Sequence, residues 1–289
     1  MSRDADAPDH LAKLVATAVA GEKDALYKHL SRLSGLPGTR PNLPFAERFG
    51  EVVASLGKSA DTFVVELATL DENQAPGATA WEFLPVCGVY ALAARSTKDD
   101  KAYKKFIGLL HGLADDPRFR VRDAIVTALV HLGSTRKVQL LDDLQPWMDG
   151  YHHAAAVVLA IANEQFISAI DRYDSIEARL EEAFALLENA PRAAARYPGH
   201  KHLVDAMNNT PRIVAARFGV PVFDQLARWT RTKDPDLRAI IEKNLTGTRL
   251  VGRYKSEIER VKAALAGTAA PVRNPDHNFG PHRGRGKKR

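Results

Sequence analysis

The sequence predicts an all-α protein, folded as a right-handed superhelical solenoid of stacked antiparallel helix pairs. Apolar residues recur at spacings of three and four along nearly the whole chain, while alternating runs rich in Val, Ile and Thr are scarce. Proline, glycine, aspartate and serine interrupt this periodicity after segments of about ten to seventeen residues. Short helices with short connections are expected to pack as antiparallel neighbours, because the chain must turn back on itself at each break.

The first helices lie between clear stop signals. Residues 6–21 combine an acidic start and an early proline with a final glycine, which is the usual asymmetry of helix ends. Two prolines and two glycines break the pattern over residues 35–42, and Asn42 is expected to cap the next helix, which begins near Pro44. Thr79 and Glu82 have the spacing of a capping box and predict another helix start.

The same alternation continues to the end of the periodic region. The other expected helices are residues 23–35, 44–57, 60–72, 80–96, 100–116, 116–133, 135–150, 152–163, 175–190, 201–209, 211–219, 221–232, 235–245 and 256–267. No segment between them resembles an interdomain linker, so residues 1–266 are predicted to form one domain. Beyond it, Pro, Gly, His and Arg dominate, and residues 267–289 are predicted to be a basic disordered tail.

Charge is segregated along the chain, whose net charge is +6. The last nineteen residues hold six basic residues and one acidic residue, which leaves the rest near neutral and argues against a uniform polyanion-binding surface. Two segments within the body are nevertheless basic: 95–136 has nine basic and five acidic residues, and 224–262 has ten and six. Between them, residues 151–190 carry seven acids and two bases. The tail composition fits a nucleic-acid-binding arm and a solubilising end equally well.

The sequence also predicts a cytoplasmic protein without a membrane span. No apolar run reaches the roughly 18 to 20 residues that a span needs, and the N-terminus mixes acids into the place where a signal peptide would be basic. The single cysteine, Cys87, lies in an apolar segment and is expected to be a buried hydrophobe.

Residues 116–133, with the sequence DPRFRVRDAIVTALVHLG, carry the most specific pattern. The apolar residues of this segment share one helical face, and several of them are small enough to let a neighbouring helix approach closely: Val121, Ala124, Ile125, Ala128, Leu129 and Leu132. Gly133 suits a left-handed helix stop. This pattern resembles the second helix of a HEAT repeat, with Asp116 and Pro117 at the turn between its helices. Residues 234–245 give a weaker match, in which Arg238 aligns with Arg122.

The HEAT resemblance implies an armadillo-like helical solenoid of about six repeats, since such repeats are about 40 to 47 residues long. Solenoids of this kind use their extended concave face for binding. More distantly, the chain resembles the HEAT-like alkylpurine DNA glycosylases, which grip damaged duplex DNA in a basic groove. That resemblance implies an aromatic pocket with a carboxylate, for which Trp81, Trp147 and Trp229 are candidates. None of them has an aspartate four residues later, as that family leads us to expect.

Arginines in the basic segments and two tryptophans are the candidate contacts for a nucleic acid or another ligand. The set is Arg118, Arg120, Trp147, Arg228, Trp229, Arg231, Arg238, Arg249, Arg253, Arg283 and Arg285. The competing interpretation is that the tryptophans pack in the core and that the arginines are merely solvated.

No catalytic motif, cofactor-binding motif or metal-ligand spacing is present. His152 and His153, like His200 and His202, are too close in sequence to face one site, so no metal site is predicted. We therefore expect a non-catalytic binding or scaffold protein, with a protein or a nucleic acid as partner and a DNA glycosylase as the alternative. If the two basic segments lay in one groove with Trp147 or Trp229 exposed, a nucleic acid would be favoured as the partner. If these segments lay on the convex face, a protein partner would be favoured.

Overall fold

The computed structural model describes residues 8–268, and over this range it contains helices but no strands. The all-α prediction is confirmed for this part of the chain. The α-helices are α1 (Pro8–Val19), α2 (Asp24–Leu33), α3 (Leu43–Ser55), α4 (Asp61–Ala68), α5 (Phe83–Lys98), α6 (Asp100–Leu113), α7 (Phe119–Arg136), α8 (Val138–Asp143), α9 (Tyr151–Ile161), α10 (Glu164–Ile167), α11 (Asp174–Glu188), α12 (Pro198–Met207), α13 (Thr210–Phe218), α14 (Val220–Trp229), α15 (Pro235–Asn244), α16 (Thr248–Arg253) and α17 (Lys255–Gly267). Short 3-10 helices are η2 (Gly57–Ala60), η3 (Ala80–Glu82), η4 (Gln145–Asp149) and η5 (Arg192–Arg196).

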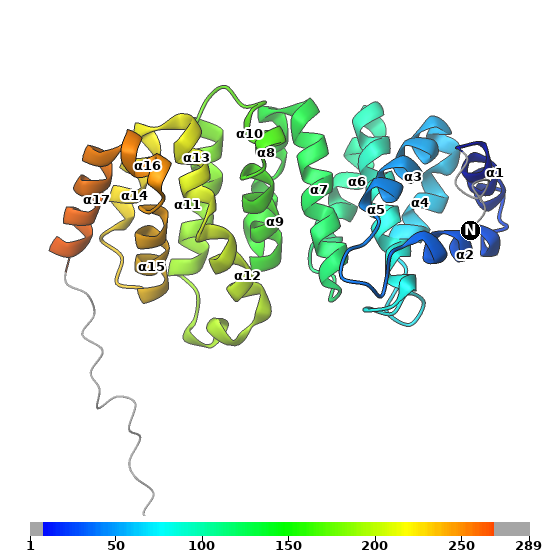
Figure 1. Ribbon diagram of the computed structural model, residues 1–289, viewed down its shortest axis with the longest axis horizontal. Coiled ribbons are helices and arrows are strands. Elements are labelled where there is room, and N and C mark those ends of the chain that lie inside the picture. The colour runs from blue at the N-terminus through cyan, green and yellow to red at the C-terminus, as the bar shows by residue number, and fades with distance from the viewer. Residues whose placement is uncertain (1–7, 269–289) are drawn as a thin grey trace, which may run out of the picture.

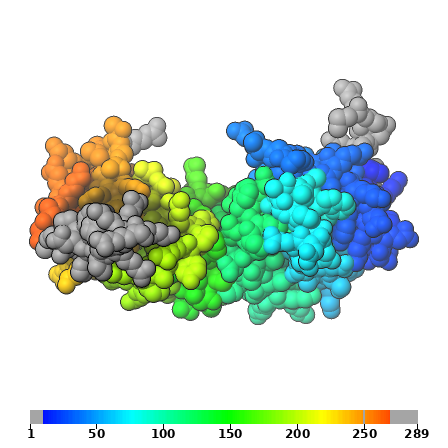
Figure 2. Space-filling model, turned by 90° about the horizontal axis from the view of Figure 1, so that it is seen from below, coloured from blue at the N-terminus to red at the C-terminus, as the bar shows by residue number. Residues whose placement is uncertain are grey.

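The central helices form two sets that lie against each other along the molecule (Figure 1). In the first set, here called the inner row, α3 packs on α5, α5 on α7, α7 on α9 and α9 on α12. The outer set covers it: α4 and α6 pack on α5, α8 packs on α7, and α11 packs on α9. Figure 2 shows that the body is bowed, with a hollowed side between the segment near residue 40 and the segment near residue 250.

Several helices start as the sequence predicts, because side chains satisfy the first backbone N–H groups. The side-chain oxygen of Asn42 accepts a hydrogen bond at the start of α3. Thr79 Oγ1 accepts from the N–H of Trp81, at 3.2 Å. The Glu82 carboxylate accepts from the N–H of Ala78, at 2.8 Å, so the reciprocal contact of the predicted capping box reaches one residue further back than expected.

The single helix expected over residues 135–150 is divided in three. α7 continues to Arg136, the backbone turns at Lys137, where φ is +53°, and the short helices α8 and η4 follow. Pro146 stands at the start of η4 and cannot donate the backbone hydrogen bond that a continuous helix would need. The break brings Asp149 to the first turn of α9.

Gly133 is not a helix stop, because α7 continues for three residues beyond it. A Cβ atom at this position would lie 2.3 Å from the ring of Phe166 in α10. The glycine therefore permits close packing between α7 and α10. The six apolar residues expected on one face of α7, from Val121 to Leu132, are all buried, as predicted.

Buried apolar side chains form one continuous cluster from Leu11 in α1 to Leu265 in α17. Cys87 is buried within it, as expected. Among the helices of residues 8–268, none has both the length and the apolar character that crossing a bilayer requires. The predicted tail, from residue 269 onward, lies outside the described residues.

Candidate functional site

The segments that precede the inner-row helices meet along one edge of the molecule, here called the start edge. Arg120 lies at the beginning of α7, and its guanidinium donates to the carboxylate of Glu82, just before α5, at 2.8 Å. It also donates to the carbonyl of Gly38, in the loop before α3, at 3.4 Å. Asp115, just before α7, lines a cleft together with residues at the starts of α9 and α12. Helix starts that are far apart in the sequence thus become neighbours.

Three large aromatic side chains are exposed on the start edge, and they are the only exposed aromatics among the described residues. Trp81 precedes α5 and is 40% exposed, Phe119 opens α7 and is 52% exposed, and Tyr197 precedes α12 and is 61% exposed. The Arg120 guanidinium lies over the Phe119 ring, 4.5 Å from its centroid. We call Trp81, Phe119 and Tyr197 the aromatic edge residues.

Next to Tyr197, a cleft of about 320 Å³ separates the starts of α9 and α12. Glycine contributes to its shape, because a Cβ atom at Gly199 would lie 3.2 Å from the His152 ring. The lining is polar and aromatic: Asp115, Gly150, Tyr151, His152, His153, Tyr197, Pro198 and Gly199.

Histidines from different helices come together around the cleft. His152 of α9 faces His202 of α12, with their Nδ1 atoms 3.0 Å apart. Burial, followed by the positive charge of Arg122, lowers the pKa of both imidazoles from the ordinary value of 6.5. Both rings are therefore neutral at pH 7, so one Nδ1 can donate a hydrogen bond to the other.

On the other side of α9, His153 meets His111 from the last turn of α6 and Asp149 from η4. Asp149 Oδ1 lies 2.8 Å from His153 Nδ1 and 3.1 Å from His111 Nε2. The two imidazole rings are 4.0 Å apart, and the ring of Trp147 packs against His111. Burial alone would raise the pKa of Asp149, but the hydrogen bonds from His111 and His153 outweigh it and lower that pKa.

This histidine and aspartate group is not predicted by the sequence pattern. As expected from their adjacent positions, His152 and His153 face different partners. His111 is far from the other two residues in sequence, so no local spacing connects it to them. The one available signal was the i, i+4 separation of Asp149 and His153.

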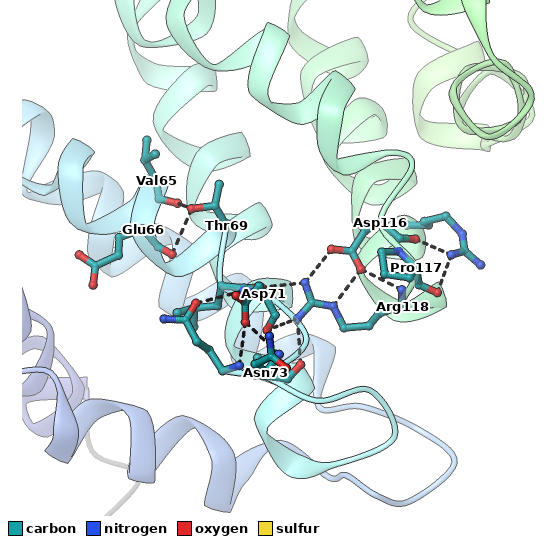
Figure 3. Close-up of polar contacts among 12 residues, drawn as sticks. Val65, Glu66, Thr69, Asp71, Asn73, Asp116, Pro117 and Arg118 are labelled. Atoms are coloured by element: carbon teal, nitrogen blue, oxygen red, sulfur yellow. Dashed lines mark hydrogen bonds and ion pairs between the residues drawn. The ribbon is translucent and has the colours of Figure 1, made fainter.

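The guanidinium of Arg118, a predicted ligand contact, is buried and bonded within the chain. It donates to both carboxylate oxygens of Asp116 and to the carbonyls of Leu70 and Ala75, at 2.8 and 2.9 Å. Figure 3 shows the side chain between Asp116 and the loop that contains Asp71. Arg118 thereby ties this loop to the start of α7.

The two candidate tryptophans are packing residues in the structure. Trp147 is only 2% exposed. Trp229 stacks on Phe184, with ring centroids 5.1 Å apart, and its Nε1–H donates to Glu181 at 3.0 Å. Trp147 therefore has no face open to a base, and Phe184 covers one face of the half-buried Trp229 indole.

The remaining candidate arginines are scattered. Arg228 pairs with Glu177 at 2.6 Å, and Arg238 donates to the Leu265 carbonyl at the end of α17, also at 2.6 Å. Arg231 and Arg253 are exposed, and Arg253 lies over the ring of Tyr254. The side chain of Arg249 and the whole of Arg283 and Arg285 lie outside the described residues.

The two basic segments lie in different parts of the molecule, the first in the end of α5, α6 and α7 and the second in α14 to α17 (Figure 1). Three exposed lysines of the first segment, Lys101, Lys104 and Lys105, belong to α6 in the outer set, and Lys98 is exposed at the end of α5. In the second segment, Arg228 pairs with Glu177 and Glu181 of the acidic segment. Part of the segregated charge in the sequence is therefore neutralised between packed helices.

Comparison with known proteins adds no relative: no family model, curated protein or solved structure matches the chain. The aromatic edge residues, the cleft and its histidines are therefore the features from which a function can be argued.

Proposed function

We propose that this chain is a HEAT-like helical solenoid that acts as a non-catalytic binding or scaffold protein and takes a protein partner at its start edge. The observation that carries this proposal is the exposure of the aromatic edge residues Trp81, Phe119 and Tyr197. Each stands at the beginning of an inner-row helix. Tyr197 lines the cleft, and Trp81 and Phe119 are the chain neighbours of Glu82 and Arg120, which pair with each other.

Two equivalent arginines support the HEAT-like assignment. Arg122 in α7 donates to the carbonyl of Asp116, six residues earlier, at 2.5 Å. Arg238 in α15, its aligned counterpart, donates to the carbonyl of Thr232, also six residues earlier, at 3.4 Å. The same side chain thus ties the same preceding turn in two separate parts of the chain, as a structural repeat would require.

Exposed aromatic residues favour a protein as the partner. Large aromatic side chains left at the surface bury much area on association, and Trp, Tyr and Arg are enriched among residues that dominate binding energy. The surroundings are polar and carry both signs of charge, with Asp115 and Arg120 close by. An aromatic centre with a polar rim is the usual composition of a protein interface.

The nucleic-acid and glycosylase alternatives receive less support. A phosphate-binding groove needs several Arg or Lys side chains free to contact phosphates. Here Arg118, Arg120 and Arg228 are each paired with a carboxylate of the same chain. Trp147 is buried, and Trp229 is partly buried and stacked on Phe184, so neither offers the aromatic pocket that base-excision chemistry would use. Trp81 is exposed, but the carboxylate of the neighbouring Glu82 is buried and paired with Arg120.

Site-directed photo-crosslinking in an extract of the source cells tests the proposal. A photoreactive residue at position 119 or 197 should give a discrete protein adduct, whereas the same residue at position 104, on the outer helix α6, should not. With the photoreactive residue at position 119, replacing Trp81 and Tyr197 by Ser should remove the adduct. With it at position 197, replacing Trp81 and Phe119 by Ser should do the same. Equal labelling at position 104, or no adduct at the edge, would refute a partner at this surface.

A second measurement separates the nucleic-acid alternative. Fluorescent duplex DNA and single strands are titrated with the full chain and with a chain ending at Thr268, across a salt series. We expect no binding by the shortened chain. Binding that survives the truncation and weakens steeply with salt would instead place a phosphate-reading surface in the helical body.

A further inference from the structure

We propose that His111, Asp149 and His153 bind one divalent transition-metal ion, with Zn²⁺ as the ion that best suits the ligands. These residues come from α6, η4 and α9. Two imidazole nitrogens and a carboxylate oxygen are among the ligand types that Zn²⁺ uses in proteins. None of these three is an aromatic edge residue, although His153 lines the same cleft as Tyr197, and the metal site does not depend on the proposed function.

The spacing of the ligand atoms fits an ion of this size. The candidate atoms of the three side chains all lie within 4.8 Å of one another. Asp149 Oδ1 is 2.8 Å from His153 Nδ1 and 3.1 Å from His111 Nε2. Tetrahedral Zn²⁺ with bonds of about 2.0–2.1 Å holds its ligand atoms about 3.3 Å apart. Shifts of well under an ångström along each of these two separations would therefore admit the ion.

The electrostatics of the group also favour a cation. The Asp149 carboxylate supplies the negative charge of the group, and its Oδ1 faces one nitrogen of each imidazole. Among the described residues, its only ion-pair partners are His111 and His153, so no Lys or Arg competes for the carboxylate. A metal ion would replace the two N–H donors that now face this oxygen and would bind the deprotonated imidazole nitrogens.

The three side chains are held by the fold before any ion arrives. Trp147 is buried and packs edge-to-face against the His111 ring, with centroids 5.2 Å apart. A Cβ atom at Gly150 would lie only 2.8 Å from His153 Nδ1, so this glycine leaves the space in which that nitrogen meets Asp149. Pre-positioned ligands reduce the entropy that metal binding would otherwise lose.

Three protein ligands leave a coordination position free, as in zinc sites where water or a substrate occupies the fourth position. His153 also lines the cleft between α9 and α12. A bound ion would therefore lie beside this cleft, where water or an oxygen or nitrogen ligand in the cleft could complete its coordination.

Titration of the full-length, chelator-treated protein with ZnCl₂ by isothermal calorimetry tests the site. Absorption of Co²⁺ as a substitute ion provides an independent report on coordination. We expect one equivalent of Zn²⁺ and a low-symmetry Co²⁺ spectrum. Asp149→Asn and His153→Gln should each weaken binding at least tenfold, because changing even a hydrogen-bonding neighbour of a ligand costs about 10- to 100-fold.

His152→Gln is the matched control, because this residue is adjacent to His153 but faces His202. It should leave the affinity and the Co²⁺ spectrum unchanged. Circular dichroism without metal identifies any variant that fails to fold. Gly150→Ala crowds His153 without removing a ligand, and it should also weaken Zn²⁺ binding. Absence of a stoichiometric site, or equal affinity in the wild type, Asp149→Asn and His153→Gln, would reduce the cluster to a hydrogen-bonded histidine–aspartate group and overturn the proposal.

Discussion

At the scale of single residues, the arginines at the start of α7 show how a basic run can serve the fold. Arg118 holds the loop before α5, Arg120 pairs with the buried Glu82, and Arg122 donates to the carbonyls of Asp116 and Pro117. Each guanidinium offers several donors in a fixed plane, which suits it to join backbone segments that have no partner of their own.

Replacing Arg118 by Ala should lower the free energy of unfolding by about 3 kcal/mol. The change removes the guanidinium donors of the Asp116 carboxylate and of two loop carbonyls, although the backbone N–H of residue 118 still donates to Asp116 Oδ1. Breaking a buried pair costs about 3–5 kcal/mol. Urea unfolding measures the difference. Arg231→Ala, at an exposed arginine, serves as the control and should change stability by less than about 0.5 kcal/mol. Similar values for the two variants would contradict the role of Arg118.

The His152 and His202 pair should make stability depend on pH. Burial and Arg122 lower both pKa values in the folded state, so the unfolded chain binds protons more readily. The stabilisation from the two neutral imidazoles is complete above the unfolded-state pKa of about 6.5. It is lost as the pH falls through the lower pKa values of the folded state. Asp123 and Asp205 oppose the shift of His202 but do not reverse it.

Melting temperatures measured between pH 7.5 and pH 5 should therefore fall for the wild-type protein. His202→Gln removes one of the two groups and should show a smaller fall over the same interval. His131→Gln, at a half-buried histidine of α7, is a suitable comparison. An unchanged slope in His202→Gln would show that the pair does not control the acid response.

At the scale of elements, close packing between helices depends on residues without side chains. Gly133 lets α7 lie against Phe166 of α10, and Gly88 lets α5 lie against Ala68 of α4, where a Cβ atom would be 2.4 Å from the neighbouring backbone. The opposite case is Gly108, which is exposed on α6 and where an added Cβ atom would meet no other atom within 4 Å.

These surroundings predict opposite effects for the same substitution. Gly133→Ala should destabilise the protein by about 1–3 kcal/mol, because the added methyl group collides with the Phe166 ring. Gly108→Ala should stabilise it by about 0.5–1 kcal/mol, because alanine restricts the unfolded chain and meets no obstacle. Thermal or urea unfolding shows whether each substitution lowers or raises the stability. An unchanged stability in Gly133→Ala would show that α10 can move away from α7 without cost.

At the level of the complete chain, packing between helices neutralises part of the charge that the sequence segregates. Arg228 of α14 pairs with Glu177 and Glu181 of α11, and Arg260 of α17 pairs with Asp224 of α14. These contacts link successive elements of the C-terminal part. Because contacts run mainly between neighbours in the row, a change at one end should be felt mainly there.

Arg238→Met tests this locality. Arg238 donates to the Leu265 and Thr268 carbonyls and so holds the end of α17. Its loss should accelerate amide hydrogen exchange in α17 while exchange in α3 and α5 stays unchanged. Arg253→Met, at an exposed arginine near the same end, should have a much smaller effect. Faster exchange throughout the chain would instead indicate one cooperative unit.

Local patterns along the chain were enough to predict the helical class, most helix positions and several helix starts, such as the Asn42 cap and the Thr79–Glu82 contacts. Those features depend on atoms within a few residues of each other along the chain. The burial of Cys87 and of one face of α7 followed from apolar periodicity in the same way.

Which side chains are available for function depends instead on how the helices pack. This packing buried Trp147 and paired Arg118 and Arg228, and it joined His111 to Asp149 and His153 across three elements. The same packing left the aromatic edge residues exposed. Local spacing cannot encode these outcomes, because each depends on how the helices pack and on which residues of separate helices meet at their ends.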